Sequence, residues 1–441
     1  MIATLRRPSF TLLWLGGLIS LAGDWVLSVG LPIYIFLLTR SVLATSLMLL
    51  ASSVPNVLLG SIAGVFVDRW DRKRTMVITN ALLALGLLPL LLVRSLDHVW
   101  IVYVVAVVES CVEQFFTPAK NAVLPTLVGE ELLVPANSLN SLSNTLARLI
   151  GPALGGLIAG FFGLNGIVLA DAASFALAAL LIAFITVPPR KAAPVGAFAE
   201  PLAAAEAGAV KRVWREWVDG LRVIRHERTL AVLLAVYAIT SLGEGVFGVL
   251  YPVFVYKVLH GIAPQIGELM TAQAIGGLLG GLLVGLAGRR ITSRWVIGFC
   301  SILFGLIDLA IFNAPSLYAT FGLAALFPLF WFAAGLFVAV GVPGIAMSTG
   351  VQSLMQARAP EAYRGRVFGA LGMTIGLLGL IGQLTAGTVT DHLGVVTVLN
   401  VQGAGYVVAG LLILWLLPRR PHKAAASAAP ATAAVPEEVT Q

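Results

Sequence analysis

Charged side chains are scarce in this chain, since Asp, Glu, Lys and Arg make up 11% of its 441 residues against about 25% in an ordinary soluble domain. Hydrophobic residues make up 59% of the sequence, and this composition excludes a soluble globular enzyme. The sequence contains no GxxxxGK[ST], HExxH or GxSxG pattern, so it offers no phosphate-binding loop, zinc-protease helix or hydrolase nucleophile. We expect no enzyme activity, no use of ATP by this chain and no cofactor or metal.

Cysteine is also rare. Cys111 and Cys300 are the only two cysteines, and they lie in different apolar stretches. Two isolated thiols provide neither a disulfide framework nor the spacing of metal ligands. We expect both to be ordinary core residues.

Long apolar runs are abundant. They recur from Phe10 to Leu417, and each is near the roughly 20 residues that a helix needs to cross about 30 Å of hydrocarbon. The first run follows Arg6 and Arg7 as a secretion signal would, but it continues to Leu38, beyond the roughly 7 to 15 apolar residues of such a signal. The sequence therefore predicts an all-α membrane protein of about twelve transmembrane helices, the first of them retained.

The basic residues alternate between loops in a way that indicates orientation. Arg40, Arg94 and Lys257 fall on one side and Arg148 falls within a span, whereas the other basic residues gather on the second side. By the positive-inside rule the second side is cytoplasmic, and both termini lie there. The net charge of +7 is dispersed over loops instead of being clustered on a soluble face, so we expect no nucleic-acid partner.

An internal repeat divides the chain. At a first constant offset, Gly23 and Asp24 align with Gly243 and Glu244. A second offset pairs Gly60 with Gly277 and Gly64 with Gly281, and a third pairs Ile150 with Ile381, Gly151 with Gly382, Gly156 with Gly387 and Gly163 with Gly394. We expect six-helix halves at residues 1–187 and 229–417, a cytoplasmic linker at 188–228 and a disordered tail at 418–441. Two such halves are typical of secondary transporters with a cavity between them.

The linker ends in a periodic segment. Val213, Trp217, Leu221 and Ile224 recur at three and four residues, and basic side chains lie mostly off that stripe. This pattern predicts an amphipathic helix. Two interpretations remain equal: the helix lies on the inner leaflet, or it is a connector that packs on the bundle.

Acidic residues within the apolar runs need an explanation, because a charge at mid-membrane costs roughly 2.5 to 3.5 kcal/mol. Asp24, Glu109, Glu113 and Glu244 are such residues. Glu109 and Glu113 are four residues apart and share one helical face. Since like-charged carboxylates in a dry site cannot all ionise easily, we expect at least one to bind and release a proton near neutral pH. The alternative is a structural role in which these acids pair with polar neighbours or with Arg148.

Arg148 is the only basic residue deep in a span, and we expect Glu109 or Glu113 to be its partner. Asp171, Glu268 and Asp308 are expected nearer the outer ends of their spans, in contact with water.

Two stretches resemble signatures of the major facilitator superfamily. Residues Gly64-Val-Phe-Val-Asp68-Arg69-Trp-Asp71-Arg72-Lys73 resemble the loop between helices two and three, whose charges form a latch on the cytoplasmic side in that family. The resemblance implies this role for Asp68, Arg69, Arg72 and Lys73, although Asp71 stands where the family usually has glycine. The stretch Gly151-Pro152-Ala153-Leu154-Gly155-Gly156 is similar to the helix-five antiporter signature of exporters.

Other segments are similar to the macrolide-efflux-like and enterobactin-exporter-like branch. They are Pro118 to Asn121, Leu124-Pro125, Asn137 and Arg364 to Phe368. The resemblance implies twelve helices, a cavity bounded by helices one, four, seven and ten, and proton-driven efflux. The arginine of the usual helix-four proton-transfer signature is absent, so that route does not carry over.

We therefore expect a proton-coupled antiporter in the inner membrane of a bacterium. It would work as a monomer among membrane lipids and export amphipathic small molecules such as drugs, macrolides or siderophores. Fixed acids beside aromatic side chains favour cations, and we expect the cavity to include Trp25, Phe247, Tyr251, Trp331 and Phe337. An importing symporter and a non-transporting scaffold or sensor are the alternatives.

Overall fold

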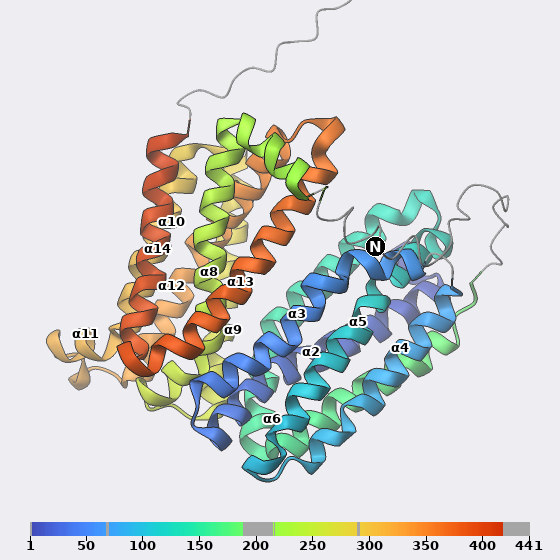
Figure 1. Cartoon of the computed structure of the whole chain (residues 1–441), viewed down its shortest axis with the longest axis horizontal. Coiled ribbons are helices and arrows are strands. Elements are labelled where there is room, and N and C mark those ends of the chain that lie inside the picture. Colours follow the sequence, from blue (N-terminus) through green and yellow to red (C-terminus); the bar gives the residue numbers. More distant parts are fainter. Residues whose placement is uncertain (1, 68–69, 188–214, 216, 289–291, 418–441) are drawn as a thin grey trace, which may run out of the picture.

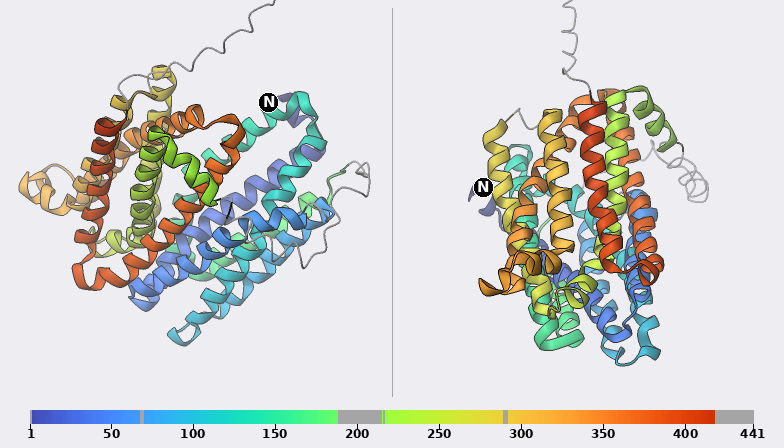
Figure 2. Two further views of the ribbon diagram at one scale, coloured as in Figure 1. Left: turned by 45° about the horizontal axis from the view of Figure 1, so that its top comes forward. Right: turned by 90° about the vertical axis from the view of Figure 1, so that its left-hand side faces the viewer.

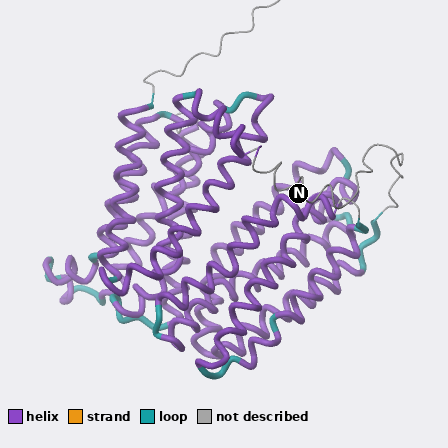
Figure 3. Tube along the Cα trace, in the orientation of Figure 1, coloured by secondary structure: helices purple, strands orange, loops and turns teal. Residues whose placement is uncertain are grey.

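A computed structural model of the chain describes residues 2–67, 70–187, 215, 217–288 and 292–417. The part of the chain so described consists of helices joined by short loops and contains no strand (Figure 3). Helices of the first half are α1 (Ile2–Leu5), α2 (Pro8–Thr39), α3 (Val42–Val67), α4 (Arg72–Gly86), α5 (Val99–Val128) and α6 (Leu133–Ala183). Those of the second half are α8 (Arg228–Lys257), α9 (Ala263–Ala287), α10 (Arg294–Phe312), α11 (Ala314–Thr320), α12 (Leu329–Arg358), α13 (Arg364–Leu393) and α14 (Val395–Leu416). Short 3₁₀ helices occupy Leu88–Leu92, Leu96–His98, Glu130–Leu132, Leu323–Ala325 and Glu361–Tyr363.

Eleven helices in the described ranges are long and apolar enough to cross a membrane. The longest, α6, contains 51 residues, which is more than one crossing needs. Its backbone leaves the helical region at Gly163, where φ is 59° and ψ is −153°. Glycine tolerates this conformation because it has no Cβ. The expected twelve spans require the two arms of α6, on either side of Gly163, to cross separately.

The same break recurs at the repeat position of the second half. Gly394, the repeat partner of Gly163, separates α13 from α14 and has φ of 82°. Each half thus turns between its last two spans at a glycine with positive φ. This agreement supports the repeat that the sequence alignment predicts.

The two halves form separate bundles that converge at one end and diverge at the other (Figure 1). Two further views show the same arrangement from other directions (Figure 2). The diverging ends carry the N-terminus, the start of α8 and the end of α14. We call this end the basic side, because it carries the loops in which most basic residues lie.

Small residues hold the halves together where they converge. Gly156 of α6 lies against α9, since a Cβ at this position would come within 3.0 Å of the carbonyl oxygens of Ala263 and Pro264. Its repeat partner Gly387 of α13 lies against α3, where a Cβ would come within 2.6 Å of Ser46. Ser46 also donates its hydroxyl to the carbonyl of Gln383, at 2.6 Å. Small residues let helix backbones approach closely, so these contacts define two crossings between the halves.

The described part of the linker packs on the second half. Trp217 donates its indole N–H to the Thr374 hydroxyl of α13, at 3.3 Å. Ile224 is buried, and Trp217 and Leu221 pack on the same cluster as Val367 and Ala370. Of the two interpretations of this amphipathic helix, the structure therefore favours the connector that packs on the bundle. Val213 lies outside the described residues.

Candidate functional site

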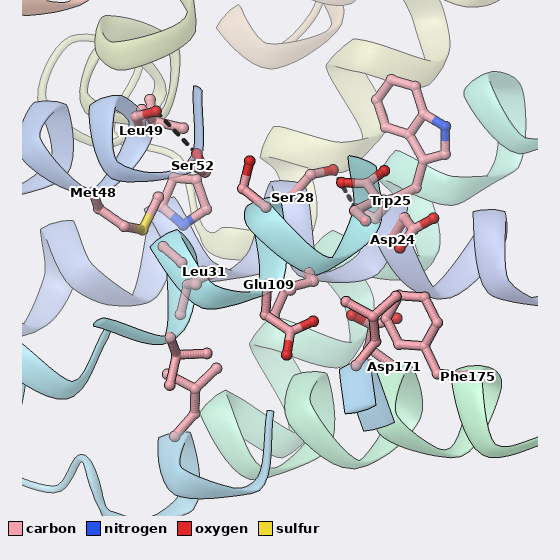
Figure 4. Close-up of a pocket in the computed structure, with 18 residues that line it drawn as sticks. Asp24, Trp25, Ser28, Leu31, Met48, Leu49, Ser52, Glu109, Asp171 and Phe175 are labelled. Atoms are coloured by element: carbon pink, nitrogen blue, oxygen red, sulfur yellow. Dashed lines mark hydrogen bonds between the residues drawn. The ribbon is translucent and has the colours of Figure 1, made fainter. Parts of the chain in front are cut away.

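A cavity of about 320 Å³ lies within the first half (Figure 4). Residues from α2, α3, α4, α5 and α6 enclose it, together with Leu90 of the 3₁₀ helix that follows α4. Apolar side chains supply most of the wall. The lining residues are Asp24, Trp25, Leu27, Ser28, Leu31, Pro32, Met48, Leu49, Ser52, Leu83, Leu90, Val105, Ala106, Glu109, Ser110, Glu113, Asp171 and Phe175.

Four carboxyl groups reach this cavity, and among the described residues no lysine, arginine or histidine lines it. They are Asp24 of α2, Glu109 and Glu113 of α5, and Asp171 of α6. The carboxyl groups of Asp24, Glu109 and Asp171 lie around the same space (Figure 4). Because α5 turns once every 3.6 residues, Glu109 and Glu113 project from one face of the helix. The sequence predicts a shared role for Asp24, Glu109 and Glu113. It does not predict that Asp171 joins them.

Glu109 packs against α4 at Gly86, where that helix has no side chain. A Cβ on Gly86 would collide with the Oε1 atom of Glu109. This oxygen is buried and has no hydrogen-bond partner. Glu113, one turn further along α5, is exposed. One carboxyl is therefore packed between helices while its neighbour meets solvent.

Asp171 is completely buried, with 0% of its surface exposed. Ser174 donates its hydroxyl to Oδ1 at 3.2 Å, whereas Oδ2 has no partner. On α2, a Cβ at Gly23 would collide with Ser174 and with Oδ1 of Asp171. The expectation of a hydrated residue near the end of its span is therefore wrong for Asp171. The sequence shows the acid itself, but not that α2 carries a glycine where Asp171 packs.

Arg148 does not pair with these acids. It is exposed, and across the described residues no ion pair joins Arg148 to Glu109 or Glu113. The expected partnership is not formed in this conformation, in which Arg148 is exposed and does not line the cavity. The nearest basic group on α5 is Lys120, whose ammonium lies beside Gly17 of α2, where a Cβ would be 3.3 Å away.

The second half holds its acids differently. Glu244 of α8 accepts a hydrogen bond from the hydroxyl of Tyr406 on α14. Asp308 of α10 is 5% exposed, and its Oδ2 accepts a hydrogen bond from Gln402 at 3.3 Å. The expectation of a hydrated position is thus wrong for Asp308 as well, because Gln402 from α14 covers it. Glu268 of α9 is exposed, as expected.

The helix-five signature lies where α6 meets two other helices. A Cβ on Gly151 would come within 2.7 Å of the Trp25 ring, and one on Gly155 within 3.2 Å of Val29. Gly156 and the carbonyl of Pro152 face α9. The four residues therefore allow α6 to touch the cavity helix α2 and the second half at once.

The loop that resembles the cytoplasmic latch is described in part. Asp68 and Arg69 lie outside the described residues, and of Gly64 only the helical backbone is described. Asp71 is the N-cap of α4 and accepts a hydrogen bond from the amide of Arg74 at 2.7 Å. Arg72 donates to the carbonyl of Ala122 on α5, at 2.8 Å, and Lys73 is half-buried. Aspartate in place of the usual glycine therefore begins a helix, which is a common role for this residue type.

The five expected aromatic residues occupy different environments. Trp25 lines the cavity. Tyr251 and Phe337 are instead buried in the core of the second half, 4% and 1% exposed, with ring centroids 5.8 Å apart. Phe247 packs on Tyr251 at 5.2 Å, and Trp331 is 64% exposed at the start of α12. The structure corrects the prediction for Tyr251, Phe337 and Trp331, because position along a span does not reveal which way a side chain points.

Comparison with known proteins gives the family. The family model described as "Transmembrane secretion effector", a major facilitator group, matches residues 1–440. Macrolide efflux protein A of Streptococcus pyogenes is 27% identical over 88% of this chain and 91% of its own length. The enterobactin exporter EntS of Citrobacter koseri is 25% identical over 93% and 92% of the two chains.

The fold comparison agrees. A bacterial homologue of the iron transporter ferroportin, solved in an inward-facing state, superposes with a TM-score of 0.71 over 92% of this chain and 98% of that chain, at 18% identity. At this identity the likeness concerns the fold alone. The fold, the repeat and the match over nearly the whole sequence show that the chain belongs to the transmembrane secretion effector family of major facilitator superfamily transporters.

Proposed function

We propose that this chain is a proton-coupled antiporter that exports amphipathic small molecules, with a preference for organic cations. The observation that carries the proposal is the cavity in which four carboxyl groups meet an apolar wall, with no basic side chain from the described part of the chain. Acidic groups in such a wall attract cations, and the apolar surface accommodates the rest of an amphipathic molecule. The relatives named for macrolide and enterobactin export support an outward direction and a drug or siderophore class.

Coupling would depend on competition between protons and substrate for the same carboxyl groups. Glu109 is packed between helices and has an unpartnered oxygen, and Glu113 is exposed. A site that is neutral when protonated and anionic when not would release a cation as protons bind. One proton that crosses a potential of 100 mV supplies about 2.3 kcal/mol, so one or two protons per cycle sustain a modest substrate gradient.

Access would alternate by rocking of the two halves. The basic side is taken as cytoplasmic by the positive-inside rule, and the halves diverge toward it (Figure 1). Closure at that side would use the loop that holds Asp68, Arg69, Asp71, Arg72 and Lys73. The cavity lies within one chain, so a monomer suffices. Arg148 would contribute when the halves move, since it is exposed in this conformation.

The test is transport by neutral variants of the cavity acids. Asp24→Asn, Glu109→Gln and Glu113→Gln, each expressed in an efflux-deficient bacterium, are expected to reduce proton-driven efflux of ethidium by about tenfold or more. Glu130→Gln is the matched control, because this glutamate is exposed in the 3₁₀ helix before α6. Folding is monitored by yield and by size-exclusion profile.

Three outcomes would contradict the proposal. Full proton-driven transport in all three variants would remove the carboxyl groups from the mechanism. Lower accumulation of the substrate after addition of a protonophore would favour an importer, since an exporter shows the opposite. Absence of any proton-linked flux in purified vesicles, over a panel of drugs and siderophores, would favour a scaffold or sensor.

A further inference from the structure

The cavity acids of the first half have repeat partners in the second half. At the first offset of the repeat Gly23 and Asp24 correspond to Gly243 and Glu244, and at the third offset Asp171 and Phe175 correspond to Gln402 and Tyr406. The packing corresponds as well. Gly23 lies against Asp171, and a Cβ on Gly243 would come within 3.0 Å of Gln402. The two halves therefore use one architecture with different chemistry at two positions.

The first difference is a hydroxyl. Tyr406 donates to Glu244, so the acid of α8 has a hydrogen-bond donor. Phe175 has no hydroxyl, and Asp24 accepts no hydrogen bond from any residue in the described part of the chain. A donor stabilises the charged form of a carboxyl group. The acid of α8 thus has a fixed hydrogen-bond donor, whereas Asp24 has none among the described residues.

The second difference is a carboxyl in place of an amide. Gln402 fills its position as an amide and donates to Asp308. Asp171 fills the corresponding position as an acid, fully buried, with Oδ2 unpartnered at the cavity wall. Because an amide meets the packing requirement in one half, the fold does not require a titratable group in the other.

The charges that surround Asp171 are of one sign. Asp24 on α2 and Glu113 on α5 line the same cavity as Asp171, and Glu109 lies on the same face of α5 as Glu113. On α4 the basic residues stand at the opposite end, where Arg72 bonds to Ala122. Lys120 of α5 lies beside Gly17, about two turns of α2 before Asp24. A buried carboxylate without a countercharge is costly, so Asp24 and Asp171 cannot both be ionised at low cost.

We propose that Asp171 binds a transported proton and shares it with Asp24, and that the corresponding acid of the second half, Glu244, has a structural role. In the substrate-free site one of the two carboxyls carries the proton. Binding of a cation, or opening to the other side, would ionise both and release the proton to water. This inference rests on the proposed function and assigns its proton to a specific pair of residues.

The test is an infrared titration of the purified protein, which needs no knowledge of the substrate. The carbonyl-stretch band of protonated carboxyl groups is followed between about pH 5 and about pH 9. Asp171→Asn is expected to reduce the titrating amplitude, because one member of the pair is lost. Glu130→Gln is the control, because this glutamate is exposed and lies outside the cavity; its loss is expected to leave the titrating amplitude unchanged.

A second variant keeps the inference testable if Asp171→Asn does not fold. Phe175→Tyr introduces the hydroxyl that Tyr406 provides in the other half, and it is expected to move the titration midpoint to lower pH by about one unit. Titration of Asp171→Asn identical to that of the wild type, or an unchanged midpoint in Phe175→Tyr, would overturn the inference.

Transport of ethidium into proteoliposomes, driven by an imposed pH gradient, separates this inference from the proposed function. If the pair titrates as expected but the gradient drives no transport in the wild type, the proposed proton-coupled transport is contradicted. The assignment of a shared proton to Asp24 and Asp171 is then retained. If the gradient drives transport equally in the wild type and in Asp171→Asn, coupling stands and the assignment to Asp171 fails.

Discussion

The rings of Phe36 and Tyr256 meet edge to face, with centroids 5.9 Å apart and planes at 74°. They lie near the ends of α2 and α8 and occupy the same position of the repeat, since the offset that aligns Asp24 with Glu244 also aligns these two residues. The guanidinium of Arg40 lies 4.8 Å from the Tyr256 ring centre, and the ammonium of Lys257 lies 5.6 Å from that of Phe36. Two cation–π contacts thus flank the pair where the halves converge.

We predict that Tyr256→Ala destabilises closure at this end. The variant removes an aromatic pair worth about 0.5 to 1.5 kcal/mol and a cation–π contact worth about 0.5 to 1 kcal/mol. The expected shift toward the opposite conformation is about five- to sixty-fold. The measurement is the rate at which an impermeant thiol reagent, added on the side opposite the basic loops, labels a cysteine at Ser28, which is exposed and lines the cavity.

Phe299→Ala is the control for this prediction. Phe299 stacks on Trp295 within a single helix, at 5.8 Å between centroids, so its loss changes no contact between the halves. Equal labelling rates in the two variants would show that the aromatic pair does not close this end.

We predict that Gly267→Ala disturbs the crossing of α6 and α9. A Cβ at this position would collide with the carbonyl oxygen of Pro152, which belongs to the backbone and has little freedom to move. Forced overpacking costs about 1 to 3 kcal/mol. A lower unfolding temperature in detergent and slower transport are expected. Gly281→Ala on the same helix is the control, since a Cβ there meets nothing within 4 Å; equal behaviour of the two variants would mean that the close approach is dispensable.

We predict that Asp71→Ala lowers stability by about 1 kcal/mol through loss of the N-cap of α4. Asp71→Asn retains an acceptor for the Arg74 amide and should preserve most of that stability. Thermal unfolding of both variants measures the effect. If the asparagine variant loses as much as the alanine variant, the negative charge of Asp71 matters more than the cap, which would favour an ion pair in the cytoplasmic latch.

We predict that Gly220→Leu releases the linker helix from α13. A Cβ on Gly220 would come within 2.6 Å of the Ala370 side chain and 3.0 Å of the Arg366 carbonyl carbon. Tryptic cleavage after Arg222 and Arg225 is expected to become faster. Asp219→Ala is the control, because its contact with Arg222 is exposed and such surface pairs contribute little. Cleavage at the control rate would show that the helix does not depend on this contact.

Much of the fold follows from local chemistry. The apolar runs are long enough to cross a membrane whatever their neighbours are, and the family and the helical fold are confirmed. The repeat also relates backbone conformations in the two halves. Gly163 and Gly394 both adopt positive φ between the last two spans of their half. Sequence reasoning likewise singles out Asp24, Glu109 and Glu113, which the structure brings to one cavity, because a charge within an apolar run is conspicuous.

The surroundings of each polar group were decided by tertiary structure alone. Asp171 and Gln402 occupy one repeat position, yet only the folded chain shows that a glycine of another helix covers each of them. Arg148 forms no ion pair with another described residue, and Tyr251 and Phe337 belong to a core instead of the cavity.

The sequence does not reveal these surroundings because the membrane helices are apolar on all sides. The sequence by itself determined that the chain crosses a membrane as paired helical bundles, since length, apolar content and loop charge are properties of each segment. A helix surrounded by lipid and by other apolar helices is hydrophobic on every side, so its pattern does not say which face meets protein, lipid or water. Only the packing of helices far apart in the chain settles which carboxyl groups remain without a partner.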